Sequence, residues 1–193
     1  ANIQSPTVPH LVDAASTVNS ASIETKVAGK ITVQAIGLFR DADAGIINKG
    51  PWPPKVGGVT QFTVHLVLTN YSSDLSNVEV TAPLQDGVVF TNVAKSNTTD
   101  QPQIDAEGGQ IVWKIQNLVA TSGITGQPPE AIFQVEVRPT SDKAGLYMPL
   151  IGQIQIKAID DFTGQAISVT GDGVDTRLPL DKTVSENQGR VVQ

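Results

Sequence analysis

The chain has 193 residues, a net charge of -6 and a pI near 4.8, and its 13 basic residues are scattered. This pattern argues against binding to nucleic acid, because phosphates require grouped Lys and Arg side chains. It has no cysteine, which excludes disulfides, thiolate metal sites and cysteine nucleophiles. No apolar run approaches the ~20 residues of a membrane span, and Ala1 to Gln4 lacks the features of a signal peptide.

The first 28 residues are polar and small, contain proline and show no helical stripe, so we expect an extended arm. Its sparse apolar side chains are candidates for filling pockets on a partner: Val8, Leu11, Val12, Val18 and Ile23. Two roles remain open for this arm. It occupies the groove of a neighbouring copy, or it lies on its own domain as an extra edge strand.

Residues 30–38 form the first predicted strand, and residues 39–58 form a long loop rich in Gly, Pro and Asp around Trp52. A long loop is usually functional or packed down by its own aromatic residue. We favour the second interpretation, in which Trp52 covers one end of the core.

Strict alternation predicts a half-buried strand from residue 59 to residue 69. One face carries Phe62, Val64, Leu66 and Leu68. His65 lies on the other face, which we expect to face solvent. A polar turn over residues 70–77 follows, and Val78 and Val80 restart the alternation.

Further strands are predicted at residues 87–93, 110–116, 131–138, 150–159 and 165–169. Trp113 and Phe133 face inward on their strands, and Gln134 faces outward. About eight strands and no helix indicate an all-β, immunoglobulin-like sandwich. We expect three parts: an arm over residues 1–28, a sandwich over residues 29–177 and a polar C-terminal tail over residues 178–193.

Three stretches carry a resemblance to a known family. They are VGGVTQFTVHLVLTN (residues 56–70), NVEVTAPLQDGVVF (77–90) and IVWKIQNL (111–118), followed by the strand AIFQVEVRP. Together they resemble the Ig-like conserved repeat domain, domain of unknown function eleven, of bacterial and archaeal surface proteins. The flanks GPWPPKVGG and IDDFTGQAIS are similar to a variant at the C-terminal ends of large exported proteins.

The sequence departs from the family pattern at one turn, where Ala82 and Gln85 replace the usual Asp and Pro. The departure weakens any feature that depends on that Asp but leaves the strand order intact. The resemblance implies a structural or adhesive module at the cell surface, and it brings no catalytic residue with it.

The sequence offers no catalytic site. His10 and His65 are the only histidines, and neither a G-x-S-x-G elbow nor an H-x-x-x-H spacing occurs. We expect no cofactor. Calcium is the one ion to consider, because loop carboxylates supply the hard oxygens that it prefers. The candidate ligands are Asp160, Asp161, Asp172 and Asp175, with Asp41 and Asp43 as a further pair.

Asn70 and Asn97 begin N-glycosylation sequons, and Asn97 lies in the more polar loop. Whether either sequon is glycosylated depends on the host.

The favoured hypothesis is a non-catalytic, extracellular subunit of a surface filament, pilus-like fibre or lattice, whose partners are copies of itself joined by strand exchange. Head-to-tail association of this kind makes filaments when the rotation does not close. The alternative is an adhesin or carbohydrate-binding module, whose partners would be cell-surface glycans or proteins. An exposed Trp52 would favour this alternative.

Overall fold

The structure, a computed structural model, describes residues 23–105, 109–185 and 188–193. The described strands are β1 (Ile31–Leu38), β2 (Thr60–Asn70), β3 (Leu75–Pro83), β4 (Val88–Ser96), β5 (Gln103–Ile104), β6 (Gln110–Leu118), β7 (Glu130–Val137), β8 (Pro149–Ile151), β9 (Ile154–Asp160), β10 (Ala166–Gly171) and β11 (Val174–Asp175). One 3-10 turn, Ser141–Lys143, is present, and no helix in the described part is long and apolar enough to cross a membrane.

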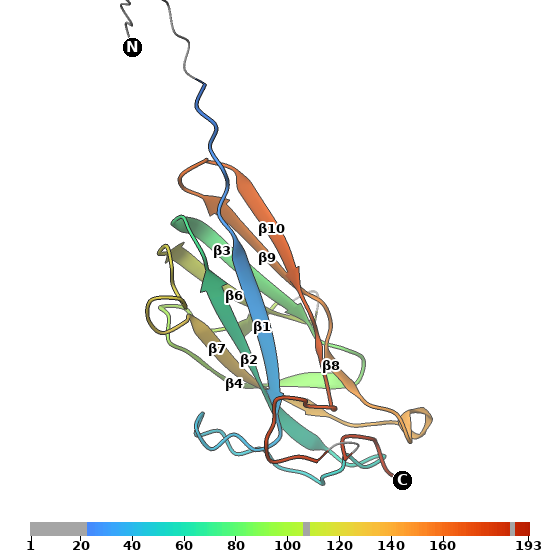
Figure 1. The fold of residues 1–193 in the computed structure, drawn as a ribbon. Coiled ribbons are helices and arrows are strands. Elements are labelled where there is room, and N and C mark those ends of the chain that lie inside the picture. The colour runs from blue at the N-terminus through green and yellow to red at the C-terminus, as the bar shows by residue number, and fades with distance from the viewer. Residues whose placement is uncertain (1–22, 106–108, 186–187) are drawn as a thin grey trace, which may run out of the picture.

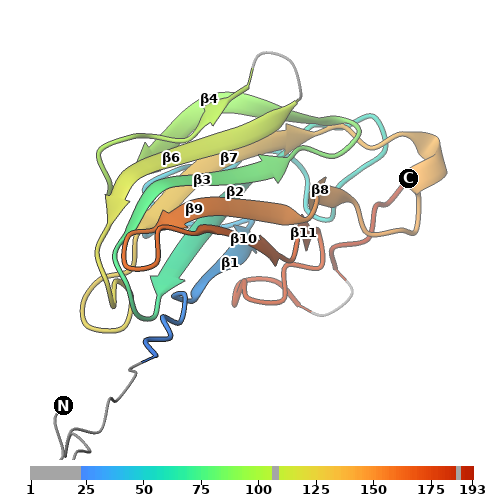
Figure 2. The same cartoon turned by 90° about the horizontal axis from the view of Figure 1, so that it is seen from above.

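Two antiparallel sheets pack face to face (Figures 1 and 2). The first sheet has the order β1-β2-β7-β4, the second has the order β10-β9-β3-β6-β5, and a small ribbon pairs β11 with β8. The predicted immunoglobulin-like sandwich is therefore confirmed. The strands that the pattern missed are β5 and β11, which have two residues each, too few for an alternating pattern to show.

Two predicted boundaries were wrong. The turn after β2 is shorter than expected, because β3 already begins at Leu75, which is fully buried. The single strand predicted over residues 150–159 is broken at Gly152, whose N–H donates to Pro83 O at 2.8 Å. The break lets β8 pair with β11 while β9 pairs with β3.

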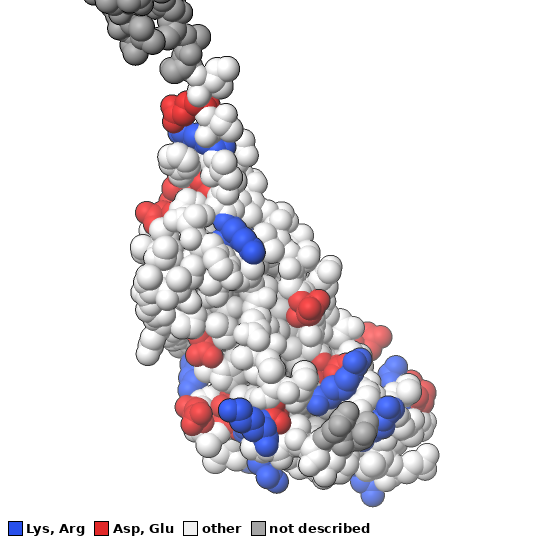
Figure 3. All heavy atoms as spheres, viewed as in Figure 1, with Lys and Arg blue, Asp and Glu red and all other residues white. Residues whose placement is uncertain are grey.

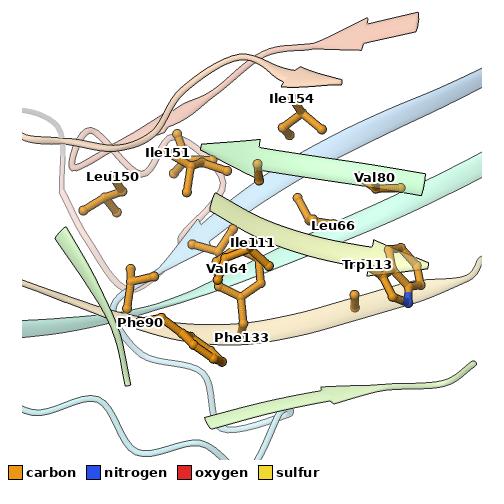
Figure 4. Packing of buried hydrophobic residues seen from close by; sticks show 14 of the residues in the cluster. Val64, Leu66, Val80, Phe90, Ile111, Trp113, Phe133, Leu150, Ile151 and Ile154 are labelled. Atoms are coloured by element: carbon orange, nitrogen blue, oxygen red, sulfur yellow. The ribbon is translucent and has the colours of Figure 1, made fainter. Parts of the chain in front are cut away.

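The core lies between the two sheets (Figure 4). As predicted, Phe62, Val64, Leu66 and Leu68 of β2 are fully buried, and they face Val80, Ile111 and Trp113 of the second sheet. Each fully buried large apolar side chain contributes roughly 1.5–3 kcal/mol. The Trp113 indole N–H donates to Thr98 Oγ1 and Asp100 O at 3.1 Å each, so its buried polar atom is satisfied.

The segment predicted as a polar tail packs against the end of the sandwich that holds β8 and β11. Leu178 and Val191 belong to the buried core. The Val192 N–H donates to Pro54 O at 2.8 Å, which ties the segment to the loop before β2. A Cβ on Gly189 would lie 1.6 Å from Thr176 O, so only glycine fits where the tail crosses this strand end.

Candidate functional site

The outer face of the first sheet is covered, which corrects two predictions. Residues 40–49 fold across this face and bury Asp41 and Ala44. His65, which was expected to face solvent, is 9% exposed, and Gln134, which was expected to point outward, is 5% exposed. Alternation shows which strand residues share a face, but it cannot show that the loop after β1 returns over its own sheet.

His65 lies between two carboxylates. Its Nε2 is 2.8 Å from Asp41 Oδ2, and its Nδ1 is 2.8 Å from Glu130 Oε1. Each ring nitrogen therefore lies within hydrogen-bond distance of a carboxylate oxygen. Asp41 comes from the loop and Glu130 from the start of β7. This acid–imidazole–acid cluster was not predicted, and its only sequence signal is a loop Asp and a strand His 24 residues apart.

The cluster holds a loop on the sheet and is not arranged for catalysis. A general base needs a free ring nitrogen beside a nucleophile or substrate, and both nitrogens of His65 are occupied by carboxylates. Neighbouring polar side chains attach the same loop. Asn48 Nδ2 donates to Thr63 Oγ1 at 2.8 Å, and Gln134 Nε2 donates to Asn48 Oδ1 at 2.8 Å. The network holds the loop on β2 and β7.

Trp52 covers one end of the core, as predicted. Its ring stacks on Phe39 with centroids 4.9 Å apart and meets Phe62 edge-on at 6.1 Å. Its indole nitrogen lies 3.4 Å from Gln188 Oε1 of the C-terminal segment. An aromatic ring packed on two others is not a free platform for a sugar, so the carbohydrate-binding alternative loses the feature that motivated it.

We expect Trp52→Ala to lower the free energy of unfolding by about 2 kcal/mol, because it removes the largest ring of a partly exposed cluster of three aromatic side chains. Urea denaturation followed by circular dichroism measures the change. Tyr71→Ala is the matched control, since Tyr71 is 45% exposed and its loss should cost less than about 1 kcal/mol. Equal losses in the two variants would show that Trp52 does not support the core.

Asp160 is fully buried at the end of β9 and joins three segments. Its Oδ2 accepts the Ser73 hydroxyl and the Gly29 N–H, both at 2.6 Å. Its Oδ1 accepts the backbone N–H groups of Phe162 and Thr163 at 2.9 and 2.8 Å. The hydrogen bond from Ser73, followed by that from Gly29, lowers the pKa of the Asp160 carboxyl well below its ordinary value of 3.8.

The structure does not bring the four calcium candidates together. Asp160 ends β9 and Asp161 follows it, whereas Asp172 and Asp175 lie beyond β10. Because β9 and β10 are antiparallel, the two pairs lie at opposite ends of the hairpin. Asp175 is paired with Arg177 at 2.9 Å. Among the described residues, no group of three His, Asp or Glu side chains is placed to hold a metal ion.

The remaining predicted sites differ in exposure. Asn70 is fully buried and its Nδ2 donates to Ser73 O, whereas Asn97 is exposed and its Nδ2 donates to Pro128 O at 2.9 Å. Of the five apolar arm residues, Ile23 is 92% exposed. The other four, Val8, Leu11, Val12 and Val18, lie outside the described residues, and so does His10.

No family model and no curated protein matches the chain, so the family resemblance stays a prediction. Three solved structures show a partial likeness. The major pilin subunit of Bacillus cereus is 12% identical over 76% of this chain (TM-score 0.43), and the full-length major pilin of Corynebacterium diphtheriae is 10% identical over 75% (TM-score 0.46). A DUF4466 family protein from Parabacteroides merdae is 12% identical over 77%, with a TM-score of 0.29.

The chain spans 40% and 34% of the lengths of those two pilins and 45% of the DUF4466 protein. At these identities and scores the likeness carries no argument about function, which must rest on the chain's own residues.

Proposed function

We propose that the chain is a non-catalytic structural subunit of an extracellular filament or pilus-like fibre, and that neighbouring copies are joined by strand exchange through the N-terminal arm. The observation that carries the proposal is the exit of the arm. Residues 23–28 are exposed and extend away from the sandwich beyond the start of β1 (Figures 1 and 2). They pair with neither sheet of their own domain.

The root of the arm is fixed, although residues 23–28 project outward (Figure 1). Gly29 is held by Asp160, Lys26 Nζ lies 4.9 Å from the centre of the Phe162 ring, and Lys30 Nζ lies 5.0 Å from the centre of the Tyr71 ring. A fixed root gives the arm a defined direction, which reduces the conformational entropy lost when it binds a neighbour.

The two ends of the domain differ in character. The C-terminal residues lie at the pole opposite the exit of the arm (Figure 1). Charged side chains gather at that C-terminal pole, whereas the strand face between the poles is mostly uncharged in the view of Figure 3. A subunit with different poles is suited to head-to-tail contact, in which one end of a copy meets a different surface of the next.

The buried polar clusters support a structural role. His65 with its two carboxylates and Asp160 with its four donors attach loops and segments to the sandwich. Neither is arranged around a free nucleophile, so both clusters stabilise the subunit that the proposal requires.

The test compares the full chain with a variant that lacks residues 1–22, by light scattering and negative-stain electron microscopy. We expect the full chain to form assemblies whose mass rises with concentration, and the truncated chain to remain a folded monomer. A variant with residues 1–22 replaced by an equally long Gly/Ser segment should also be monomeric. A monomeric full chain, or assemblies that persist without the arm, would overturn strand exchange.

A further inference from the structure

In the part of the chain that the structure describes, one stretch of β6 has no neighbouring strand on its outer side. Gly109 O accepts from Leu84 N, on the β3 side, whereas Gln110 O accepts from Asp105 N, on the β5 side. Because backbone groups alternate along a strand, the N–H and C=O of Lys114 and Gln116 point away from β3. The β5 strand is too short to reach them, since it pairs only with Ile111 and Val112.

A groove runs along this same edge. Residues 97–100 form its opposite wall, and its volume is about 510 Å³. Thr98, Ile115, Asn117, Leu118 and Ser122 are among the residues that line it, and Asp100 is the only charged one. Among the described strands, β6 pairs with β3 along its length but with β5 only at Ile111 and Val112, so no strand lies beside Lys114 or Gln116 on this side. The groove is therefore open beside this stretch of β6.

The other sheet edges are less suited to strand addition. β4 is irregular between Phe90 and Ala94, and Asn92 has a φ of 63°. β10 lies beside β1, where a Cβ on Gly171 would lie 3.2 Å from Val33 O. β6 keeps one register against β3 from Gln110 to Leu118 without a bulge. Bulges and covered edges prevent pairing with another chain, and residues 114–118 have neither.

We propose that the groove along residues 115–118 of β6 receives residues 10–22 of a second copy as an added strand. The inference rests on the proposed strand exchange and names its acceptor. The incoming strand would supply N–H and C=O partners to Lys114 and Gln116 and would pack beside Ile115 and Leu118, which line the groove.

The composition of the arm matches the groove. Asp13 is the only charged residue among residues 1–22, and no proline occurs between Pro9 and Pro51. A nearly uncharged strand can enter a nearly uncharged groove without desolvating ions. Because proline cannot donate a ladder hydrogen bond, residues 10–22 are free to pair along their whole length.

Reach favours a second copy over the arm's own domain. Residues 10–22 span roughly 40 Å when extended at ~3.3 Å per residue, and a strand opposite residues 114–118 needs about 17 Å of that. Residues 23–28 lead away from the sandwich (Figure 1), so insertion into the same domain would require the chain to reverse. A neighbour's groove requires no reversal.

The chain has no cysteine, so single cysteines can report the contact cleanly. One variant, the acceptor, carries Gln116→Cys. Four separate arm variants carry Ala14→Cys, Ala15→Cys, Ser16→Cys or Thr17→Cys. Each arm variant is mixed with the Gln116→Cys variant under mild oxidation, and dimers are counted on a non-reducing gel. The control acceptor is Gln155→Cys, which is also exposed and outward on the second sheet, but whose strand is paired on both sides.

We expect cross-linking to Gln116→Cys at alternate arm positions, because successive strand residues point to opposite faces. The yield should exceed that of the Gln155→Cys control at least about fivefold, because a disulfide requires Cβ atoms about 4 Å apart. Equal yields for the two acceptors, or no alternation along the arm, would overturn the groove assignment.

The two proposals fail in different ways. If assembly needs the arm but no cross-link forms at Gln116→Cys, strand exchange is supported and this groove is ruled out as its acceptor. If the cross-link forms in a closed dimer and no fibres appear, the groove is supported as the acceptor and the filament proposal is ruled out. A chain that cross-links only within one copy, seen when both cysteines are placed in the same molecule, would reject both.

Discussion

Replacing Asp160 with alanine is expected to lower the free energy of unfolding by about 3–4 kcal/mol, since four partly buried hydrogen-bond donors lose the acceptor that they share. The donors left unpaired are the N–H groups of Gly29, Phe162 and Thr163 and the hydroxyl of Ser73. Chemical denaturation at neutral pH measures the loss. Because Gly29 is the root of the arm, assembly of the variant should weaken even at temperatures where it remains folded.

Asp161→Ala is the matched control. Asp161 is the next residue, but it is exposed, and among the described residues its side chain accepts a hydrogen bond only from the Ser76 hydroxyl at 2.6 Å. Its replacement should change stability by no more than about 0.5 kcal/mol. If both variants were equally stable, the buried carboxylate would not hold the three segments together.

Asp160 also gives the protein an acid-dependent part of its stability. Its pKa in the folded protein is depressed below the ordinary value of 3.8, first by the Ser73 hydroxyl. The stabilisation is therefore fully present above about pH 4 and is lost as the pH falls further toward the folded pKa. The stability difference between wild type and Asp160→Asn should be constant from about pH 7 to pH 5 and should shrink below pH 4.

Replacing His65 with alanine is expected to lower the free energy of unfolding by about 3 kcal/mol, because it leaves the buried Asp41 side chain without its imidazole hydrogen-bond partner. The Asp41 side chain is 2% exposed and that of Glu130 is 34% exposed. Release of the loop over β2 should also speed tryptic cleavage after Arg40 and Lys49, which can be followed by mass spectrometry.

Glu130→Gln is the control for the His65 cluster. It removes the charge on the more exposed side of the ring and keeps a hydrogen-bond acceptor, so it should cost less than about 1 kcal/mol. Asp41→Asn should fall between the two. A Glu130→Gln variant as unstable as His65→Ala would mean that the buried Asp41 contact is not the stronger one.

Much of the scaffold could be predicted because it depends on local alternation. Phe62, Val64, Leu66 and Leu68 recur every second residue, and a strand of that pattern has one buried face whatever its partners are. The inward positions of Trp113 and Phe133 followed in the same way and are confirmed. The capping position of Trp52 was predictable from its flanking prolines and the length of its loop.

The candidate sites could not be read so directly, because their members are distant in sequence. His65 looked solvent-facing by alternation, and only the return of residues 40–49 across the sheet placed Asp41 beside it. Asp160 was considered as an ion ligand with Asp172, but antiparallel pairing separates the two ends of that hairpin and gives Asp160 backbone donors instead.

By itself the sequence determined an all-β sandwich, its principal core residues and the presence of a polar, nearly uncharged arm, since each depends on composition and short-range periodicity. The tertiary structure was needed to show that, among the described residues, part of β6 has no neighbouring strand on its outer side. The order of strands in a sheet depends on long-range pairing, which places β5 against two residues of β6 and leaves Lys114 and Gln116 open. The acceptor that we propose for the arm exists only through that order.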